Sequence, residues 1–209
     1  MMRCFFLLLC FAVSLCAAAQ KKISVVYESA FDADASTSLR RINILLAAND
    51  SVSFLTTVLA GGKNIPLKVP LGSKFMSHNQ YFHPAKNLTL TQSHPMNRPK
   101  YLVVDTVKKL AWMLAEGEKE ILGYACKKVA AQDGNRTFIA WYAPELPFSI
   151  GPNGFGGLPG VILELSDVSA RHTQKAIRVE HDAPEIIEPT DGKKITTDEF
   201  HKVLANLQR

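Results

Sequence analysis

Short runs of alternating apolar and polar residues, rich in β-branched and aromatic side chains, recur along most of the chain. Such alternation is typical of strands that bury one face. The N-terminal part of the chain carries these runs at residues 22–29, 39–47 and 51–59. Ala48-Asn49-Asp50 separates the last two runs and predicts a turn. The pattern therefore predicts consecutive strands.

The alternation weakens between Gly61 and Pro99. Prolines recur in this segment, at positions 66, 70, 84, 95 and 99. Because proline donates no backbone hydrogen bond and fixes φ, we expect edge strands and surface loop here. Within the segment, only residues 87–92 have the pattern of a strand.

Regular alternation returns at Tyr101. It predicts strands at residues 101–107, 110–116, 120–132, 136–143, 161–169 and 174–182. Asp133-Gly134-Asn135 is a strong hairpin signal, whereas we expect a turn at Gly117 and a bulge at Gly123. Strands that follow one another so closely predict an antiparallel meander.

The C-terminus has a different pattern. Thr196 and Glu199 have the spacing of a capping box, which marks the start of a helix. Four apolar residues then fall on one helical face: Phe200, Val203, Leu204 and Leu207. The whole chain predicts a mainly-β fold, with a single curved antiparallel sheet and a short C-terminal α-helix packed on it. The pattern is analogous to the half-barrel of periplasmic lipoprotein carriers.

The N-terminus predicts export. Arg3 precedes an apolar stretch, Cys4–Cys16, and the small residues Ala17–Ala19 fit a cleavage site. The apolar stretch is shorter than the about 20 residues that span a membrane. We expect a signal peptide at 1–19 and one domain at 20–209, located in the periplasm or cell envelope of a bacterium. The alternative is lipidation of Cys16, although Leu15 stands where lipoprotein processing prefers a small residue.

Cys126 is the one cysteine that remains after the predicted cleavage, so the mature chain forms no internal disulfide. Cys126 and Tyr124 are two residues apart and therefore share a face of the predicted strand. A free cysteine in a strand often behaves as a small buried apolar residue. The alternative is a reactive thiol.

The net charge of +5 is distributed in scattered basic pairs. These pairs are Arg40-Arg41, Lys108-Lys109, Lys127-Lys128 and Lys193-Lys194. A nucleic-acid-binding surface would need a clustered basic stripe and a matching fold signature. The charge pattern therefore argues against nucleic acid as a partner.

Glycines gather at Gly154–Gly160, just before the apolar run that starts at Val161. A phosphate-binding loop would need a Lys and a following helix, and a dinucleotide site would also open a helix. The segment leads into a strand, so we expect no nucleotide cofactor. Pro159-Gly160 suits the middle of a type II turn, in which Gly160 has positive φ.

The stretch from Gly123 to Leu165 resembles the GLPGLI family of secreted Bacteroidetes proteins. The resemblance is carried by Gly123, Tyr124, Cys126, Lys128, Ala140-Trp141-Tyr142, Pro144-Glu145, Pro147, Gly151-Pro152 and Gly157-Leu158-Pro159-Gly160. Val161 departs from the Leu of the family name. The resemblance extends loosely from Trp112 to the C-terminal helix. It implies a periplasmic or cell-envelope protein and supplies no catalytic residue.

The candidate binding residues lie around the glycine segment. They are Trp141, Tyr142, Phe155, Gly157, Leu158, Pro159 and Gly160, with Trp112, Phe138 and Phe148 expected nearby. Exposed aromatic residues of this kind would form an apolar cleft with polar edges. The hypothesis is a non-enzymatic binding or assembly factor for a lipid, peptide or protein partner.

The alternative is a thiol- or histidine-dependent enzyme or a metal-binding protein. It rests on Cys126 and on His78, His83 and His94, near which Met96 adds a soft metal ligand. The histidine spacing matches no standard zinc motif. No hydrolase nucleophile elbow or zinc-protease motif occurs either, so the sequence identifies no catalytic constellation.

Overall fold

The computed structural model describes residues 22–31, 39–48, 52–61, 79–95, 99–107, 109–169, 172–183 and 185–206. For residues 31, 39–48 and 52–61 it describes the backbone alone. The predicted signal peptide, His78, Met96 and Leu207 lie outside the described residues.

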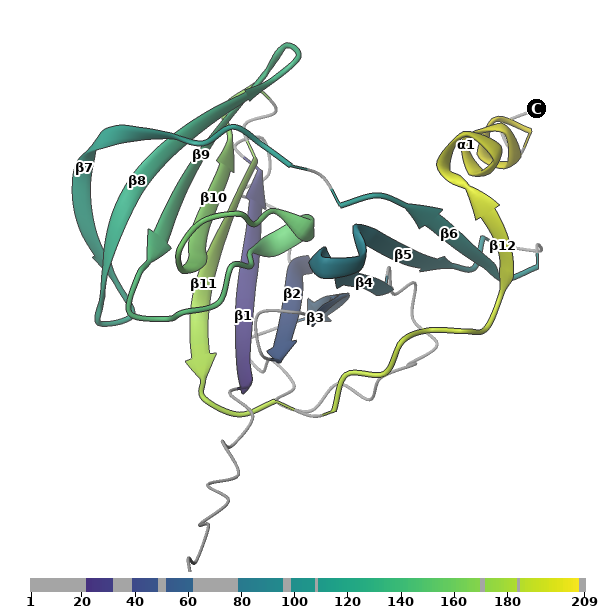
Figure 1. The fold of residues 1–209 in the computed structure, drawn as a ribbon, viewed down its shortest axis with the longest axis horizontal. Coiled ribbons are helices and arrows are strands. Elements are labelled where there is room, and N and C mark those ends of the chain that lie inside the picture. The colour runs from purple at the N-terminus through teal and green to yellow at the C-terminus, as the bar shows by residue number, and fades with distance from the viewer. Residues whose placement is uncertain are drawn as a thin grey trace, which may run out of the picture.

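Within the described residues, strands form one sheet of twelve members, and a short helix ends the chain (Figure 1). The prediction of a mainly-β fold is confirmed. The strands are β1 Lys22–Phe31, β2 Leu39–Ala48, β3 Val52–Gly61, β4 Asn79–His83, β5 Leu88–Ser93, β6 Tyr101–Asp105, β7 Met113–Ile121, β8 Tyr124–Asp133, β9 Arg136–Ala143, β10 Val161–Asp167, β11 His172–Glu180 and β12 Lys193–Thr196. The helices are the 3-10 turns η1 Pro84–Lys86 and η2 Pro152–Gly154, and α1 Thr197–Ala205.

Two antiparallel meanders make up the sheet. Strands β1 to β6 form one and β7 to β11 the other, and β1 pairs with β11 to join them. Strand β12 then adds to β6 in parallel, with Ile195 opposite Val103. That pair departs from the all-antiparallel prediction, because a long connection returns the chain to β6 in the same direction.

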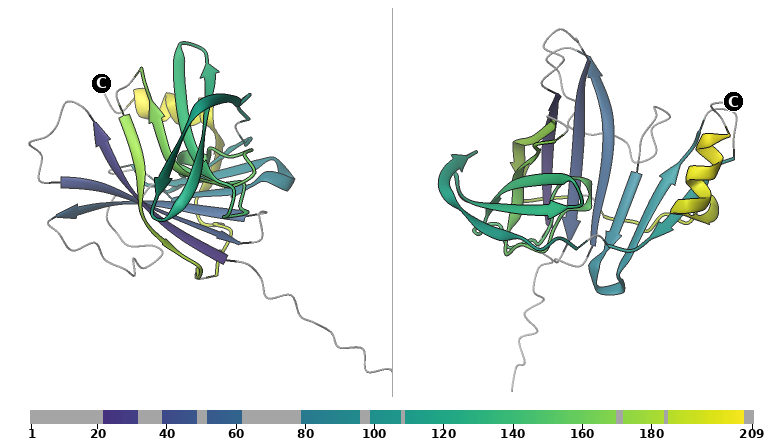
Figure 2. Two further views of the ribbon diagram at one scale, coloured as in Figure 1. Left: turned by 90° about the vertical axis from the view of Figure 1, so that its left-hand side faces the viewer. Right: turned by 90° about the horizontal axis from the view of Figure 1, so that it is seen from above.

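The order of the strands requires a strongly curved sheet. Strand β6 lies next to one edge and β7 forms the other edge, yet the two follow one another in the chain. The link from Asp105 to Met113 reaches at most about 28 Å, whereas the two strands of a flat sheet would lie about 48 Å apart. Curvature closes that distance (Figure 2).

The β9–β10 connection, residues 144–160, lies across the sheet in front of β10, β11 and β1 (Figure 1). Its apolar residues Leu146, Phe148 and Ile150 pack in one core cluster with Ile23, Val25 and Tyr27 of β1, all of them nearly inaccessible to solvent. Tyr27 Oη donates to the Ile162 carbonyl at 2.7 Å. The space in front of β1 is thus filled by the protein's own chain.

The two glycines of the β7–β8 hairpin take the opposite of their predicted roles. Gly117 lies inside β7, next to a shift in register between Leu114 and Glu118, and has a φ of +132°. Leu122 and Gly123 form the turn, with φ of 54° and 84°. Two positive φ values give a turn whose twist matches that of the flanking strands.

Strands β4 and β12 were missed by the sequence analysis. β4 lies in the proline-rich segment and ends immediately before Pro84, which begins the η1 turn. It pairs on both sides, with β3 and β5. The prolines bound this strand instead of excluding it, because Pro84 stands after the last ladder position.

The C-terminal helix starts at its predicted cap. Glu199 N–H donates to Thr196 Oγ1 at 3.3 Å, and Thr196 N–H donates to Glu199 Oε2 at 2.8 Å. Phe200 and Val203 pack on the cluster formed by Tyr101, Val103 and Ile195. Leu204, which is 36% exposed, is not part of this cluster. Helix α1 packs on β6 and β12 at the sheet edge, and none of its described residues is fully buried.

Candidate functional site

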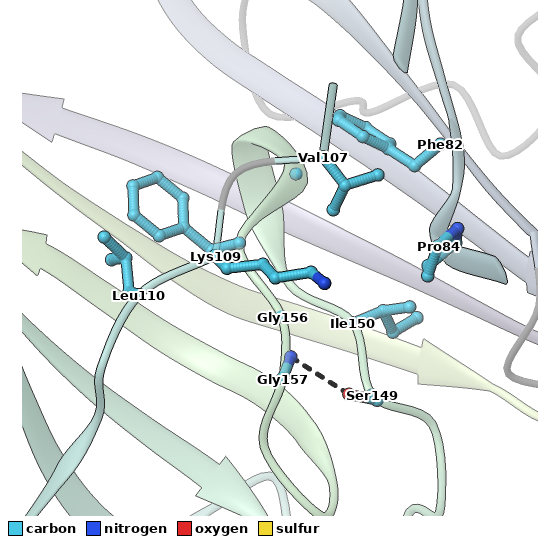
Figure 3. Close-up of a pocket in the computed structure, with 11 residues that line it drawn as sticks. Phe82, Pro84, Val107, Lys109, Leu110, Ser149, Ile150, Gly156 and Gly157 are labelled. Carbon is cyan, nitrogen blue, oxygen red and sulfur yellow. Dashed lines mark hydrogen bonds between the residues drawn. The ribbon is translucent and has the colours of Figure 1, made fainter. Parts of the chain in front are cut away.

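A pocket of about 310 Å³ lies beside the glycine segment (Figure 3). Three parts of the chain line it: β4 with η1, the link from β6 to β7, and the β9–β10 connection. The lining residues are Phe82, Pro84, Val107, Lys109, Leu110, Ser149, Ile150, Gly154, Phe155, Gly156 and Gly157. Most of this surface is apolar or glycine backbone.

The η2 turn seats the connection directly on β4. Asn153 adopts the left-handed conformation, with φ of 56°, and Gly154 follows with φ of 76°. A Cβ on Gly154 would lie 2.1 Å from the Phe82 ring. Only glycine permits both the positive φ and this close approach. The contact brings β4 and the glycine segment together on one side of the pocket.

The other side of the pocket is held by Trp112. Its Nε1 donates to the Gly156 carbonyl at 2.9 Å, and its ring lies 6.4 Å from that of Phe155. Phe155 also packs on Phe138, with ring centroids 4.9 Å apart. Ser149 Oγ accepts a hydrogen bond from Gly157 N–H at 3.0 Å (Figure 3). These contacts fix the backbone that surrounds the pocket.

Lys109 supplies the charge of the site. Its side chain extends from the β6–β7 link across the pocket towards Ile150 (Figure 3). The lining that the structure describes includes no carboxylate to neutralise this ammonium group. Lys109 is exposed to solvent, so its ammonium group is accessible to an anion, although solvent and salt screen the attraction. The pocket can therefore bind an anionic group attached to an apolar body.

The predicted binding residues are only partly brought together. Phe155 and Gly157 line the pocket. Tyr142 and Leu158 are 5% and 6% exposed and belong to the core cluster around Phe138. Pro159 and Gly160 lie outside the described lining, Pro159 being exposed.

Trp141 points to a different place. It packs against the cluster that contains Cys126 and lies under two ammonium groups, with Lys119 Nζ 4.3 Å and Lys128 Nζ 5.7 Å from its ring centroid. Lys119 also donates to Glu164 at 2.6 Å. Trp141 therefore belongs to a cation–aromatic and ion-pair cluster separate from the pocket.

Gly160 does not have the positive φ that a type II turn would require. The glycines with positive φ in this connection are Gly154 and Gly157. At Gly160 the constraint is space, since a Cβ would lie 2.2 Å from the Ala143 carbonyl oxygen. The two ends of the connection approach so closely there that no side chain fits.

No pattern in the sequence indicated Phe82, Lys109 or Leu110 as site residues. Phe82 lies in a segment predicted to be largely loop, and its contact with Gly154 joins distant parts of the chain. Lys109 carried a signal only as half of a basic pair. No local pattern could bring these residues to the glycine segment.

Cys126 is buried as predicted. It is 2% exposed, and Tyr124 packs against the same core cluster. Burial raises the pKa of the Cys126 thiol above its ordinary value. Since the thiolate is the reactive form, the site disfavours nucleophilic chemistry at this residue.

His83 and His94 are described and lie on β4 and after β5. Among the described residues, no group of three or more His, Cys, Asp or Glu side chains converges on a common point. None of the helices that the structure describes is long and apolar enough to span a membrane.

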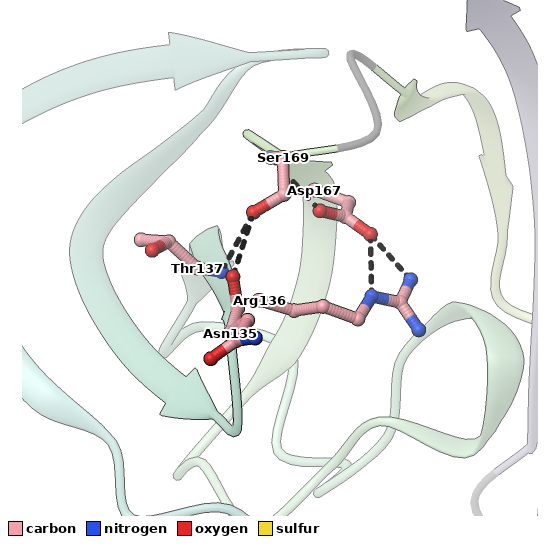
Figure 4. A network of polar contacts seen from close by, with 5 residues as sticks. All are labelled: Asn135, Arg136, Thr137, Asp167 and Ser169. Atoms are coloured by element: carbon pink, nitrogen blue, oxygen red, sulfur yellow. Dashed lines mark hydrogen bonds and ion pairs between the residues drawn. The ribbon is translucent and has the colours of Figure 1, made fainter.

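A polar network closes the far ends of β9 and β10 (Figure 4). Arg136 Nε donates to Asp167 at 2.8 Å, and Nη2 donates to the same oxygen. Asp167 is 4% exposed and also accepts from Ser169 N–H. Ser169 Oγ in turn donates to the Asn135 carbonyl. The buried Asp167 carboxylate, with its several donors, therefore holds the β8–β9 turn against the end of β10.

The fold and the pocket define a class of protein. In this class the β9–β10 connection packs on the inner face of an open, curved β-sheet, and a small pocket lies beside the connection. A family model described as "Protein of unknown function (Porph_ging)" matches residues 131–164. That match includes Gly157–Gly160 and is compatible with the GLPGLI resemblance. No curated protein matches the sequence.

Two solved structures are similar to this chain, titled as structures of PNGF-II in the C2 and P21 space groups. They have TM-scores of 0.61 and 0.62, at 15% and 14% identity, and cover 90% and 88% of this chain. The chain spans 33% of each of those chains, about a third of their length. At this identity the likeness establishes the fold alone.

Proposed function

We propose that the protein is a non-enzymatic binding module of the bacterial cell envelope. Its pocket beside the glycine segment binds a small ligand, or the side chain of a peptide or protein partner, that combines an apolar body with an anionic group. The leading support is Lys109, an ammonium group that faces apolar lining with no carboxylate among the described lining residues.

The size of the pocket limits the ligand. A volume of about 310 Å³ lies at the lower end of the range for small-molecule sites. Leu146, Phe148 and Ile150 occupy the space in front of β1. A complete lipid held inside the curved sheet is therefore disfavoured relative to a compact anionic ligand.

The enzyme alternative has weaker support. Cys126 is 2% exposed and burial raises its pKa, which is the opposite of what an activated thiol needs. His83 Nδ1 is buried without a hydrogen-bond partner among the described residues, so the structure describes no carboxylate that orients the ring through this nitrogen.

Fluorescence titration with 8-anilinonaphthalene-1-sulfonate, an apolar anion, tests the proposal. We expect saturable binding to the folded protein, with displacement by octanoate and weaker displacement by the uncharged octanol. Lys109→Met keeps the length of the side chain and removes the charge, so it should weaken binding about tenfold. Lys194→Met on the exposed face of β12 is the matched control and should leave binding unchanged.

Equal affinity of the Lys109→Met variant and the wild type would contradict the proposal, as would equal displacement by octanoate and octanol. Thermal melts of both variants are the control for folding: unchanged melting temperatures would show that the dye does not bind to partly unfolded protein.

A further inference from the structure

A second pocket, of about 280 Å³, lies on the other side of Gly154. Its base is one face of β4, β5 and β6, and its walls are η2 and the first turns of α1. The lining residues are Gln80, Phe82, Thr89, Thr91, Val103, Asp105, Thr106, Asn153, Gly154, Thr197 and Phe200. We infer that this pocket binds an uncharged, hydroxyl-rich ligand, a sugar residue of a neutral glycan.

The register of the strands places the polar base on a single face. Gln80 pairs with Thr91, and Thr91 pairs with Val103 on the next strand. One row further along, Phe82 pairs with Thr89 and Thr89 with Asp105. Directly paired residues point to the same side of a sheet. Hydroxyl and amide groups therefore form a strip on this face at β4, β5 and β6. At β1 the same face of the sheet carries apolar residues instead.

Part of this polar strip already has partners. Thr197 Oγ1 donates to Asp105 Oδ2 at 2.8 Å, and Thr106 N–H donates to Asp105 Oδ1 at 2.7 Å. Thr89 Oγ1 donates weakly to the Thr106 carbonyl at 3.4 Å. These bonds hold the carboxylate in place and tie α1 to β6.

The remaining polar groups are available to a ligand. The side chains of Gln80, Thr91 and Asn153 make no hydrogen bond to any other residue that the structure describes. Each of them can both donate and accept. A sugar hydroxyl also donates and accepts, so it satisfies such groups better than an ion does.

The charge of the pocket argues against the two ionic alternatives. The described lining holds no cationic side chain, so a phosphate or carboxylate would enter without a counter-charge. Its one carboxylate, Asp105, keeps its charge and accepts hydrogen bonds on both oxygens, and a single carboxylate supplies too few oxygen ligands to hold a metal cation. The partly buried ring of Phe200 supplies the apolar surface against which the C–H face of a sugar ring packs, whereas Phe82 is 6% exposed and contributes little.

The test measures binding of neutral hexasaccharides to the full chain by saturation-transfer NMR and calorimetry. The probes are maltohexaose, cellohexaose, mannohexaose and xylohexaose, with the anionic hexagalacturonate for comparison. We expect at least one neutral hexamer to bind and hexagalacturonate to bind more weakly. Failure of all four neutral hexamers to bind, or binding of hexagalacturonate alone, would overturn the inference.

Two substitutions locate the binding without disturbing the fold. Thr91→Val keeps the branched strand side chain, and Asn153→Gly keeps the left-handed backbone at this position. Loss of both hydrogen-bonding groups should weaken binding about tenfold, with the melting temperature close to that of the wild type. Unchanged affinity in this double variant would also overturn the inference.

The Lys109→Met variant separates the two pockets. It should leave sugar binding unchanged, because Lys109 is not in the second lining. The result for sugars is therefore independent of the anion-binding proposal for the first pocket.

Discussion

At the residue scale, the connection depends on glycines for two different reasons. Gly154 and Gly157 have positive φ, which side chains resist. Gly160 has ordinary φ but no room for a Cβ beside the Ala143 carbonyl. The sequence shows a glycine at all three positions but does not show whether backbone conformation or lack of space requires it. Only the folded backbone reveals where two segments approach each other.

Gly160→Ala should destabilise the protein by about 1–3 kcal/mol, because the added methyl forces two backbone segments apart. Gly160→Asn should cost more, since its side chain is larger. At Gly157, which has open space around it, Asn should be tolerated at least as well as Ala, because Asn accepts positive φ. Urea unfolding of the four variants gives these free energies.

If Asn proved better than Ala at position 160, the constraint would be conformational and the steric explanation would be wrong.

At the element scale, the C-terminal helix is the part that local sequence describes best. Its cap uses a hydrogen-bonding pair only three residues apart, so the pattern is readable without the rest of the fold. The strands β1, β5 and β9 also lie close to their predicted positions. β4 and β12 were missed because each is short, and because pairing with neighbours decides whether so short a run is a strand.

Thr196→Ala should reduce the stability of the protein by about 1 kcal/mol through loss of the cap. Urea unfolding measures it, with Thr190→Ala, at an exposed loop position away from any helix, as the matched control. A change no larger than experimental error would mean that α1 contributes little to global unfolding.

The same cap predicts a pH dependence. Hydrogen bonds from Thr196 lower the pKa of Glu199 below its ordinary value. A lowered pKa in the folded state gives stability that is present above the unfolded pKa and is lost as the pH falls through the folded value. Glu199→Gln keeps the capping geometry without the charge, so it should flatten stability between about pH 3 and 5.

Unfolding curves at several pH values in that range measure the effect. A wild type and Glu199→Gln variant with parallel pH profiles would contradict it.

At the scale of the whole molecule, the β9–β10 connection takes the place of a ligand in front of β1. It joins β1, β4 and β10 through one apolar cluster, and the short β6–β7 link holds the sheet curved around it. The two pockets lie on opposite sides of η2, at the tip of this connection. The connection is therefore both core and part of the candidate binding surface.

Phe148→Ala should cost about 3–5 kcal/mol, as expected for a large cavity in a core, because Phe148 is 4% exposed within this cluster. Phe155→Ala, at the partly buried tip, should cost less and should instead alter dye binding to the first pocket. Equal losses of unfolding free energy would show that the connection is not divided into a core part and a binding part.

The sequence by itself determined the strand-rich character, the helix cap and the hairpin at Gly134. Each of these depends on neighbours within a few residues, through alternation, capping or turn chemistry. The tertiary structure alone decided that β1 lies beside β11, that β12 runs parallel to β6, and that Gly154 rests on Phe82. Those arrangements come from packing between segments far apart in the chain, where the free energy depends on shapes that no local pattern records.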